Sequence, residues 1–161
     1  MVRRFENTNY WILILGGSSG LGLASAKKLA LEGMNICIIH RNSRAEMESI
    51  NEGFTLIKNQ NIQFLSLNKD VLNLQHQQDV LAEIKLALGT DGKIRCLLHS
   101  IAKGNLKPMI GSENESLSTD DFSITLQAMS TSLYDWTKLI FNENLFAEDA
   151  RILAFTSEGS K

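Results

Sequence analysis

Three glycines, Gly16, Gly20 and Gly22, stand in Gly-x-x-x-Gly-x-Gly spacing between an apolar run and a stretch with helical periodicity. Such a turn lets bare backbone approach a diphosphate, and the N–H groups of the helix start stabilise its charge. The same glycines would suit an ordinary surface loop, so the flanking strand and helix decide the interpretation. No Gly-Lys-Ser/Thr follows, which argues against a nucleoside-triphosphate P-loop. We predict a dinucleotide-binding turn with contacts from Gly16, Ser18, Ser19, Gly20, Leu21 and Gly22.

A second candidate group follows the next apolar run, 36–39, where the sequence continues His40-Arg41 with Arg44 close by. A dinucleotide fold that prefers NAD places an acid here to bind the ribose 2′-hydroxyl, and this stretch has none. A guanidinium pairs with a 2′-phosphate through two hydrogen bonds. The sequence therefore favours NADPH over NADH, with Arg41 as the first candidate and Arg44 as the second. The alternative is that both arginines are solvated surface charges.

The elements that must position these residues alternate between strand-like and helix-like patterns. Capping-box spacing of Ser43 with Glu46, and of Ser118 with Asp121, marks two helix starts. We expect strands near 11–15, 36–39, 62–67, 94–99 and 151–156, and helices near 23–31, 43–59, 74–88 and 118–146, the last with a break near 129–131. This alternation predicts an α/β fold, a Rossmann-type doubly wound parallel sheet of about five strands in one domain spanning 1–161. A ligand then belongs at the carboxyl ends of the strands.

Composition excludes several classes of protein. The chain has 161 residues, 43% of them apolar and 21% charged, which suffices for one domain with a buried core. Its net charge of −2 gives no general reason to bind nucleic acid or an anionic membrane. We find no apolar run long enough to span a membrane and no apolar core of a signal peptide, and expect a cytoplasmic protein. Cys37 and Cys96, each inside an apolar run, are expected to be small buried thiols.

The glycine spacing resembles the cofactor turn of the short-chain dehydrogenase/reductase family, and other positions agree. Asp70-Val71, after the third expected strand, matches the family pair in which the carboxylate accepts from the adenine amino group and the apolar residue packs on the ring. After the fourth strand, most of the family has Asn-Asn-Ala-Gly. Here His99-Ser100-Ile101-Ala102 resembles the branch of enoyl-acyl-carrier-protein reductases, in which this segment runs beside the ribose and nicotinamide. From its sequence alone, His99 is expected to be a hydrogen-bonded core histidine.

The resemblance also implies a catalytic tyrosine and lysine after the fifth strand. Ser157 stands where the active-site serine, or its equivalent in the enoyl reductases, is expected, and only four residues follow it. The expected tyrosine and lysine would therefore lie beyond Lys161. Tyr134 and Lys138 have the Tyr-x-x-x-Lys spacing, yet they precede the fifth strand, and spacing of i and i+4 places them on one face of the long expected helix by geometry alone. We reject them as the catalytic pair and expect Tyr134 to be a packing or interface residue.

The resemblance therefore implies the amino-terminal, cofactor-binding part of an NADPH-dependent enoyl-acyl-carrier-protein reductase, with an incomplete carboxyl-terminal part. Its substrate would be a trans-2-enoyl thioester, carried on acyl carrier protein, and the intact protein would be a homo-oligomer. The 161 residues alone are expected to be inactive. Two alternatives stay open: a reductase of 3-oxoacyl thioesters or other carbonyl compounds, and a non-catalytic dinucleotide-binding module. No metal site is expected.

Overall fold

The computed structural model describes residues 3–112 and 115–156, and a five-stranded sheet is at its centre. All four strand pairs are parallel, in the order β3-β2-β1-β4-β5. The expected α/β doubly wound fold is therefore confirmed. The strands are β1 (Tyr10–Leu15), β2 (Asn35–His40), β3 (Phe64–Asn68), β4 (Lys93–His99) and β5 (Phe146–Ala154).

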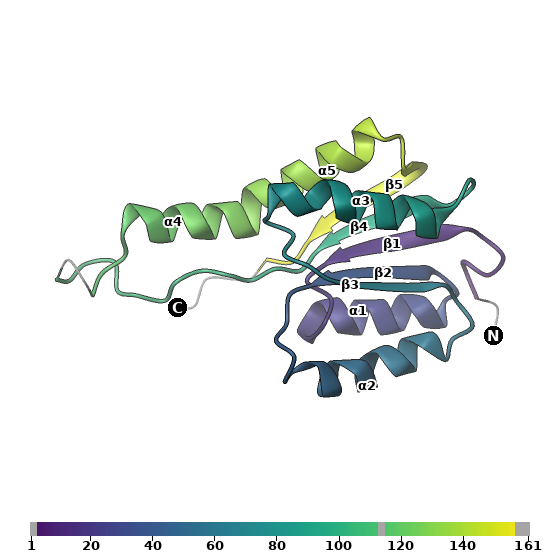
Figure 1. Ribbon diagram of the computed structural model, residues 1–161, viewed down its shortest axis with the longest axis horizontal. Coiled ribbons are helices and arrows are strands. Elements are labelled where there is room, and N and C mark those ends of the chain that lie inside the picture. Colours follow the sequence, from purple (N-terminus) through teal and green to yellow (C-terminus); the bar gives the residue numbers. More distant parts are fainter. Residues whose placement is uncertain (1–2, 113–114, 157–161) are drawn as a thin grey trace.

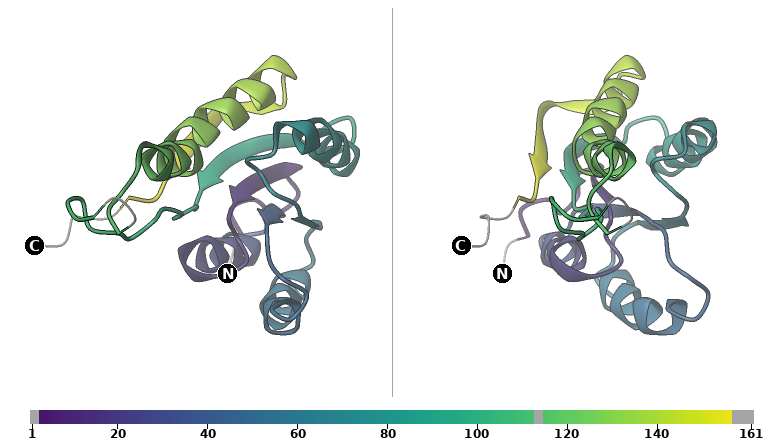
Figure 2. Two further views of the ribbon diagram at one scale, coloured as in Figure 1. Left: turned by 60° about the vertical axis from the view of Figure 1, so that its left-hand side comes forward. Right: turned by 90° about the vertical axis from the view of Figure 1, so that its left-hand side faces the viewer.

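Helices cover both faces of the sheet (Figures 1 and 2). Two of them, α1 (Gly20–Leu31) and α2 (Met47–Lys58), lie on one face. The opposite face carries α3 (Leu74–Leu88) and α5 (Ser132–Asn142), and α4 (Thr119–Leu126) precedes α5 and extends beyond the sheet. This layering places the ends of the strands, rather than the faces of the sheet, within reach of a ligand.

Side chains of β1 alternate between two separate cores, as the period of two in a strand requires. Ile12 and Ile14 point into the core shared with α1 and α2, where Phe54 is buried. Leu13 belongs to the core shared with α3 and α5, where Trp136 is fully buried. The run of apolar residues in β1 is continuous because both faces of this central strand are covered.

The strand order reverses beside β1. The chain runs outward from β1 to β2 and β3, and then crosses back through α3 to place β4 on the other side of β1. In open parallel sheets such a switch point leaves a crevice at the carboxyl ends of the two central strands. Here those ends are Leu15 and His99, which pair in the sheet. The glycine turn and the segment 100–102 follow them directly.

Several expected boundaries differ from the observed ones. Helix α2 begins at Met47 rather than at Ser43, because Ser43 N–H donates to Glu46 Oε2 at 2.7 Å and closes a turn ahead of the helix. The long expected helix ends at Asn142 instead of near 146, since Asn144 adopts a left-handed conformation with φ of 54°. Strand β5 consequently starts at Phe146, five residues earlier than expected.

The break expected near 129–131 is present as a π-helix, η1 (Gln127–Thr131), between α4 and α5. The capping box at Ser118 is also present, with Asp121 N–H donating to Ser118 Oγ at 3.2 Å and Ser118 N–H donating to Asp121 Oδ2 at 2.9 Å. Within residues 3–112 and 115–156, no helix combines the length and apolarity needed to cross a membrane.

Candidate functional site

Close backbone approach explains two glycines of the turn. Gly16 has φ of +87°, and a Cβ there would lie 2.5 Å from the Ser100 carbonyl oxygen. A Cβ on Gly22 would lie 2.4 Å from the Gly16 carbonyl oxygen. Real Cβ atoms do not come this close, so the turn folds tightly against β4 only because both side chains are missing. Gly20, with φ of +53°, has open space instead, with no heavy atom within 4 Å of its virtual Cβ.

The start of α1 presents backbone donors toward this space. Ser19 is the residue before the helix, and its side chain makes no capping hydrogen bond. The first intrahelical bond runs from Leu23 N–H to the Ser19 carbonyl at 3.1 Å. The N–H groups of Gly20, Leu21 and Gly22 precede this bond, and no acidic residue occupies the first turn of α1. A helix start of this kind favours an anion through its N–H groups and its dipole.

Backbone hydrogen bonds extend the sheet beyond the strand ends and hold the turn in line with its neighbours. Gly16 N–H donates to Ile39 O at 2.8 Å, and Ser100 N–H donates to Leu15 O at 2.8 Å. Lys69 N–H donates to His40 O, also at 2.8 Å. The residues that follow β1, β2, β3 and β4 therefore meet at one edge of the sheet.

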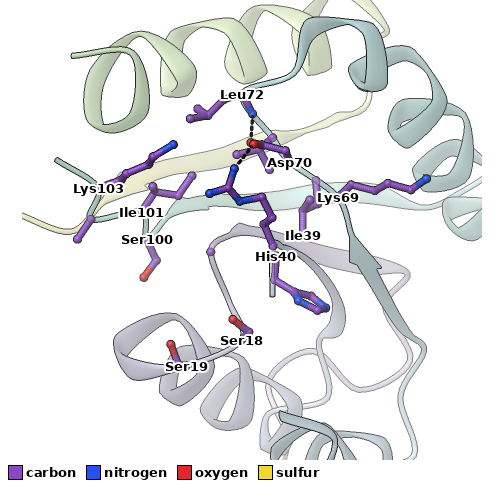
Figure 3. A pocket seen from close by; sticks show the side chains of 14 residues that line it. Ser18, Ser19, Ile39, His40, Lys69, Asp70, Leu72, Ser100, Ile101 and Lys103 are labelled. Carbon is purple, nitrogen blue, oxygen red and sulfur yellow. Dashed lines mark hydrogen bonds and ion pairs between the residues drawn. The ribbon is translucent and has the colours of Figure 1, made fainter. Parts of the chain in front are cut away.

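A cavity of about 240 Å³ lies at this edge (Figure 3). Backbone and side chains from all four strand ends line it. The lining comprises Gly16, Ser18, Ser19, Ile39, His40, Arg41, Lys69, Asp70, Val71, Leu72, Ser100, Ile101, Ala102 and Lys103. Ten of the residues expected from the sequence to contact a cofactor are thus brought together. The fully buried Trp136 supports this wall, because its Nε1–H donates to the Val71 carbonyl at 3.0 Å.

Two of the expected ligand-binding side chains bind each other. Arg41 donates through Nη1 to Asp70 Oδ2 at 2.7 Å, and Asp70 Oδ1 accepts from Leu72 N–H at 2.9 Å. Figure 3 shows both interactions meeting at the Asp70 carboxylate. The side chain of Arg41 is 62% exposed and that of Asp70 29% exposed, so solvent screens the pair. Within residues 3–112 and 115–156 this is the one hydrogen bond of the Arg41 side chain, so its other guanidinium donors remain for a ligand or solvent.

Two buried histidines end β2 and β4. His40 Nδ1 lies 2.9 Å from Asn42 Oδ1 and its Nε2 lies 3.2 Å from Ser66 Oγ. His99 Nε2 lies 2.9 Å from Ser132 Oγ, and the Ser132 hydroxyl donates to the Ala128 carbonyl. Burial lowers the pKa of both imidazoles from the ordinary value, so they are neutral near pH 7. His99 is accordingly a hydrogen-bonded core histidine, which confirms the expectation from sequence.

A second and larger cavity, of about 620 Å³, adjoins the first. The two share Gly16, Ser19 and the segment 100–102. Leu21 and Gly20 line the second cavity from α1, and Met129 of η1 and Phe155 after β5 line its far side. One cleft therefore runs from the ends of β2 and β3, past the glycine turn, to the ends of β4 and β5.

Other residues singled out in the sequence lie away from this cleft. Arg44 is exposed and is not among the residues that line either cavity in the described part of the chain. Tyr134 is 63% exposed on α5, and its ring lies 5.9 Å from Lys138 Nζ, so it packs on its own helix rather than in the core. Within residues 3–112 and 115–156, neither Tyr134 nor Lys138 lines the cleft.

The catalytic residues expected from the family resemblance fall outside the described part of the chain. Ser157 and Lys161 both lie beyond residue 156, where that part ends. The role of Ser157 therefore stays a prediction, and so does the expectation that a catalytic tyrosine and lysine follow Lys161. Strand β5 ends at Ala154, and this residue lines the second cavity together with Phe155 and Thr156. The last described residues thus border the cleft.

The two cysteines are buried free thiols, as expected. Burial raises the pKa of Cys37 well above its ordinary value and that of Cys96 to about 11. They belong to the cores on opposite faces of the sheet, Cys37 with α3 and Cys96 with α1 and α2. Both thiols are therefore protonated near pH 7 and serve as small core residues.

Four residues that line the first cavity were not expected from the sequence, namely Ile39, Lys69, Leu72 and Lys103, and neither was a packing role for Gly17. Lys69 and Lys103 line the first cavity, and both directly adjoin residues that were singled out, Asp70 and Ala102. Their position directly after expected strands could have indicated that they line the ligand site. A Cβ on Gly17 would lie 2.8 Å from Ile38 Cγ2, so this glycine lets the turn pack on β2. Nothing in the local sequence distinguishes Gly17 from a spacer, because the contact comes from a different strand.

The chain matches a family model described as short chain dehydrogenase over residues 10–161. This match covers most of the chain and includes the glycine turn, all five strands and the helices between them. No curated protein matches the chain in sequence.

Solved structures with the same fold come from short-chain dehydrogenases and related oxidoreductases. A short-chain dehydrogenase/reductase from Serratia marcescens BCRC 10948 has a TM-score of 0.70 at 19% identity, covering 96% of this chain and 57% of that one. A dehydrogenase from Burkholderia cenocepacia with bound NADP has a TM-score of 0.68 at 20% identity, and the match covers 88% of this chain and 50% of that one. A D-mannonate oxidoreductase from Haemophilus influenza with bound NAD has a TM-score of 0.71 at 18% identity, and the match covers 92% of this chain and 55% of that one. The chain spans about half the length of these proteins.

Proposed function

Because the chain belongs to the short-chain dehydrogenase family, we propose that it forms the cofactor-binding part of an NADPH-dependent oxidoreductase. The observation that carries this proposal is the convergence of four strand ends on one cleft, with the glycine turn in the middle and Arg41 at one end. A nicotinamide dinucleotide has a diphosphate at its centre and a nucleoside at each end, and the cleft has matching parts.

The residues present fit this group. The turn is folded tightly at Gly16 and Gly22 and is open at Gly20. This open space leaves room for a diphosphate against the N–H groups of α1. Val71 is buried in the wall of the first cavity and offers an apolar surface to an adenine ring. Arg41 is the guanidinium in that lining and offers charge-assisted hydrogen bonds to a 2′-phosphate. The shared segment 100–102 then runs beside the ribose and nicotinamide.

The substrate that we propose is a trans-2-enoyl thioester, which would be reduced at its β-carbon. When bound, the cofactor supplies a hydride from C4 of its nicotinamide. The chain's part in this step is to orient the cofactor along the cleft and to exclude water with the apolar lining of the second cavity, including Ile101, Met129 and Phe155. Support comes from His99 to Ala102, which resembles the enoyl-acyl-carrier-protein reductase branch and borders both cavities through its last three residues. We further propose a carrier-bound acyl substrate, a homo-oligomeric protein and a cytoplasmic location.

Cofactor titration of the 161-residue chain tests the first part. We expect NADPH to bind at least about tenfold more tightly than NADH, because a charge-assisted hydrogen bond contributes about 1.5–3 kcal/mol. Arg41→Ala is expected to remove this preference and leave NADH affinity unchanged. Arg44→Ala is the matched control, an arginine three residues later and outside the cavity lining, and should change neither affinity. Equal affinities in the unmodified chain would contradict the phosphate pocket.

Substrate assays on the full gene product test the second part. We expect NADPH oxidation with crotonyl thioester and none with a 3-oxoacyl thioester of the same length. The reverse preference would replace this proposal with a carbonyl reductase, and cofactor binding without turnover of either would favour a binding module. The 161 residues alone are expected to give no turnover, since the tyrosine and lysine that the family resemblance implies after the fifth strand are not among them.

A further inference from the structure

The ion pair between Arg41 and Asp70 joins the two polar side chains that we assign to different parts of one cofactor. Arg41 follows β2 and Asp70 follows β3, and the two carry opposite charges 2.7 Å apart within the lining of the first cavity. We propose that Asp70 is a specificity-determining residue that competes with the 2′-phosphate for Arg41 and so limits the preference for NADPH. This inference rests on the proposed function of Arg41.

Asp70 is the fixed partner of the pair. Its Oδ1 accepts from Leu72 N–H at 2.9 Å and its carbonyl accepts from Asn73 N–H at 3.2 Å, so the residue is held in a turn at the start of α3. The Arg41 side chain is more than twice as exposed as that of Asp70 and has no other hydrogen bond within the described residues. The anchored carboxylate therefore sets the direction of the guanidinium, rather than the reverse.

The negative charge of Asp70 determines which cofactor it disfavours. With no phosphate present, the carboxylate already neutralises Arg41 and occupies one of its donors. A 2′-phosphate must displace Asp70 or share Arg41 with it, and the two anions then repel each other. A 2′-hydroxyl carries no charge and meets no such opposition, so Asp70 weakens binding of NADPH relative to NADH. Lys69 and Lys103 line the same cavity and attract a 2′-phosphate whether or not Asp70 carries its charge, so they favour NADPH without changing the direction of the Asp70 effect.

Asp70→Asn is the informative substitution. Asparagine keeps the size of the side chain and an oxygen that accepts from Leu72 N–H, and it removes only the negative charge. The ratio of NADPH affinity to NADH affinity, measured by calorimetric titration of the 161-residue chain, is expected to rise about two- to fivefold, as the strength of exposed ion pairs implies. The ratio is used because a lost contact to adenine would weaken both cofactors equally. Asp91→Asn, an exposed aspartate just before β4 at the opposite edge of the sheet, should leave the ratio unchanged.

The double variant with Arg41→Ala and Asp70→Asn tests this inference separately from the proposed phosphate pocket. In an Arg41→Ala background, Asp70→Asn should raise the ratio far less, because no guanidinium remains to be released. A ratio that is unchanged or lower in Asp70→Asn, or that rises equally without Arg41, overturns the inference and leaves the phosphate pocket standing if Arg41→Ala still weakens NADPH. If Arg41→Ala leaves NADPH affinity unchanged, the phosphate pocket and this inference both fall. Circular dichroism and the unfolding midpoint confirm that each variant is folded.

Discussion

At the ends of β1 and β4, backbone atoms shape the cleft, whereas at the ends of β2 and β3 the charged side chains of Arg41 and Asp70 do so. In the first region, a side chain at Gly16 would meet the Ser100 carbonyl at 2.5 Å. In the second, Arg41 is exposed and Asp70 is half-buried, and neither is packed in the core. The first region therefore has little freedom to change without loss of the fold. The second can change its ligand preference at small cost in stability.

Crowding at Gly16 gives the largest expected effect. Gly16→Ala adds a Cβ that must shift the backbone of Ser100, directly after β4, and we expect it to cost about 3 kcal/mol in the free energy of unfolding. Gly20→Ala is the matched control, since Gly20 belongs to the same turn, also has positive φ, at 53°, and has open space around its Cβ. It should cost about 1 kcal/mol from backbone strain alone. Urea unfolding measures both, and similar costs at the two positions would show that crowding at Gly16 adds nothing to the strain of its positive φ.

Gly20 sharpens the comparison, because it belongs to the same turn and yet its Cβ would meet no protein atom within 4 Å. Gly20→Val is expected to abolish measurable cofactor binding, since its branched side chain fills the space that we assign to the diphosphate. Its stability should fall only slightly further than that of Gly20→Ala, because no protein atom lies within 4 Å of the Cβ position. Circular dichroism, urea unfolding and cofactor titration on one sample decide this. Normal binding by Gly20→Val would show that the diphosphate does not lie there.

The same contrast explains what the sequence could and could not predict. Strands, glycine spacing and the helix break near Met129 are local patterns, and the structure contains each of them. The pairing of Arg41 with Asp70 joins residues 29 positions apart and depends on β2 and β3 being neighbours. Gly17 likewise contributes through contact with Ile38 on another strand. Such features depend on strand order, which short sequence patterns do not specify.

The two buried histidines are expected to have a smaller effect, on the pH dependence of stability, and one histidine lies at each end of the cleft. His99 ends β4 and His40 ends β2, and burial lowers the pKa of each from 6.5. The unfolded chain therefore binds more protons than the folded one below pH 6.5, and stability falls as the pH is lowered from there toward the depressed pKa values of the folded state. His99→Gln should reduce this loss between about pH 7 and pH 5, because it removes one of the two buried imidazoles. Thermal unfolding at several pH values tests it, and an unchanged pH dependence would mean that His99 does not contribute.

Substitution of Tyr134 has the smallest expected effect on binding and stability, and it tests whether the catalytic residues lie at the cleft or on α5. Its hydroxyl is on an exposed ring of α5, and within the described residues Tyr134 and Lys138 line neither cavity. Tyr134→Phe should therefore leave cofactor affinity unchanged and shift stability by less than about 0.5 kcal/mol, as for other surface substitutions. It should also leave enoyl-thioester reduction by the full gene product unchanged, because a group that donates to developing negative charge must lie within hydrogen-bond distance of it. Loss of turnover in folded Tyr134→Phe, with cofactor binding intact, would place the catalytic pair on α5 and show that the cleft alone does not hold the chemistry.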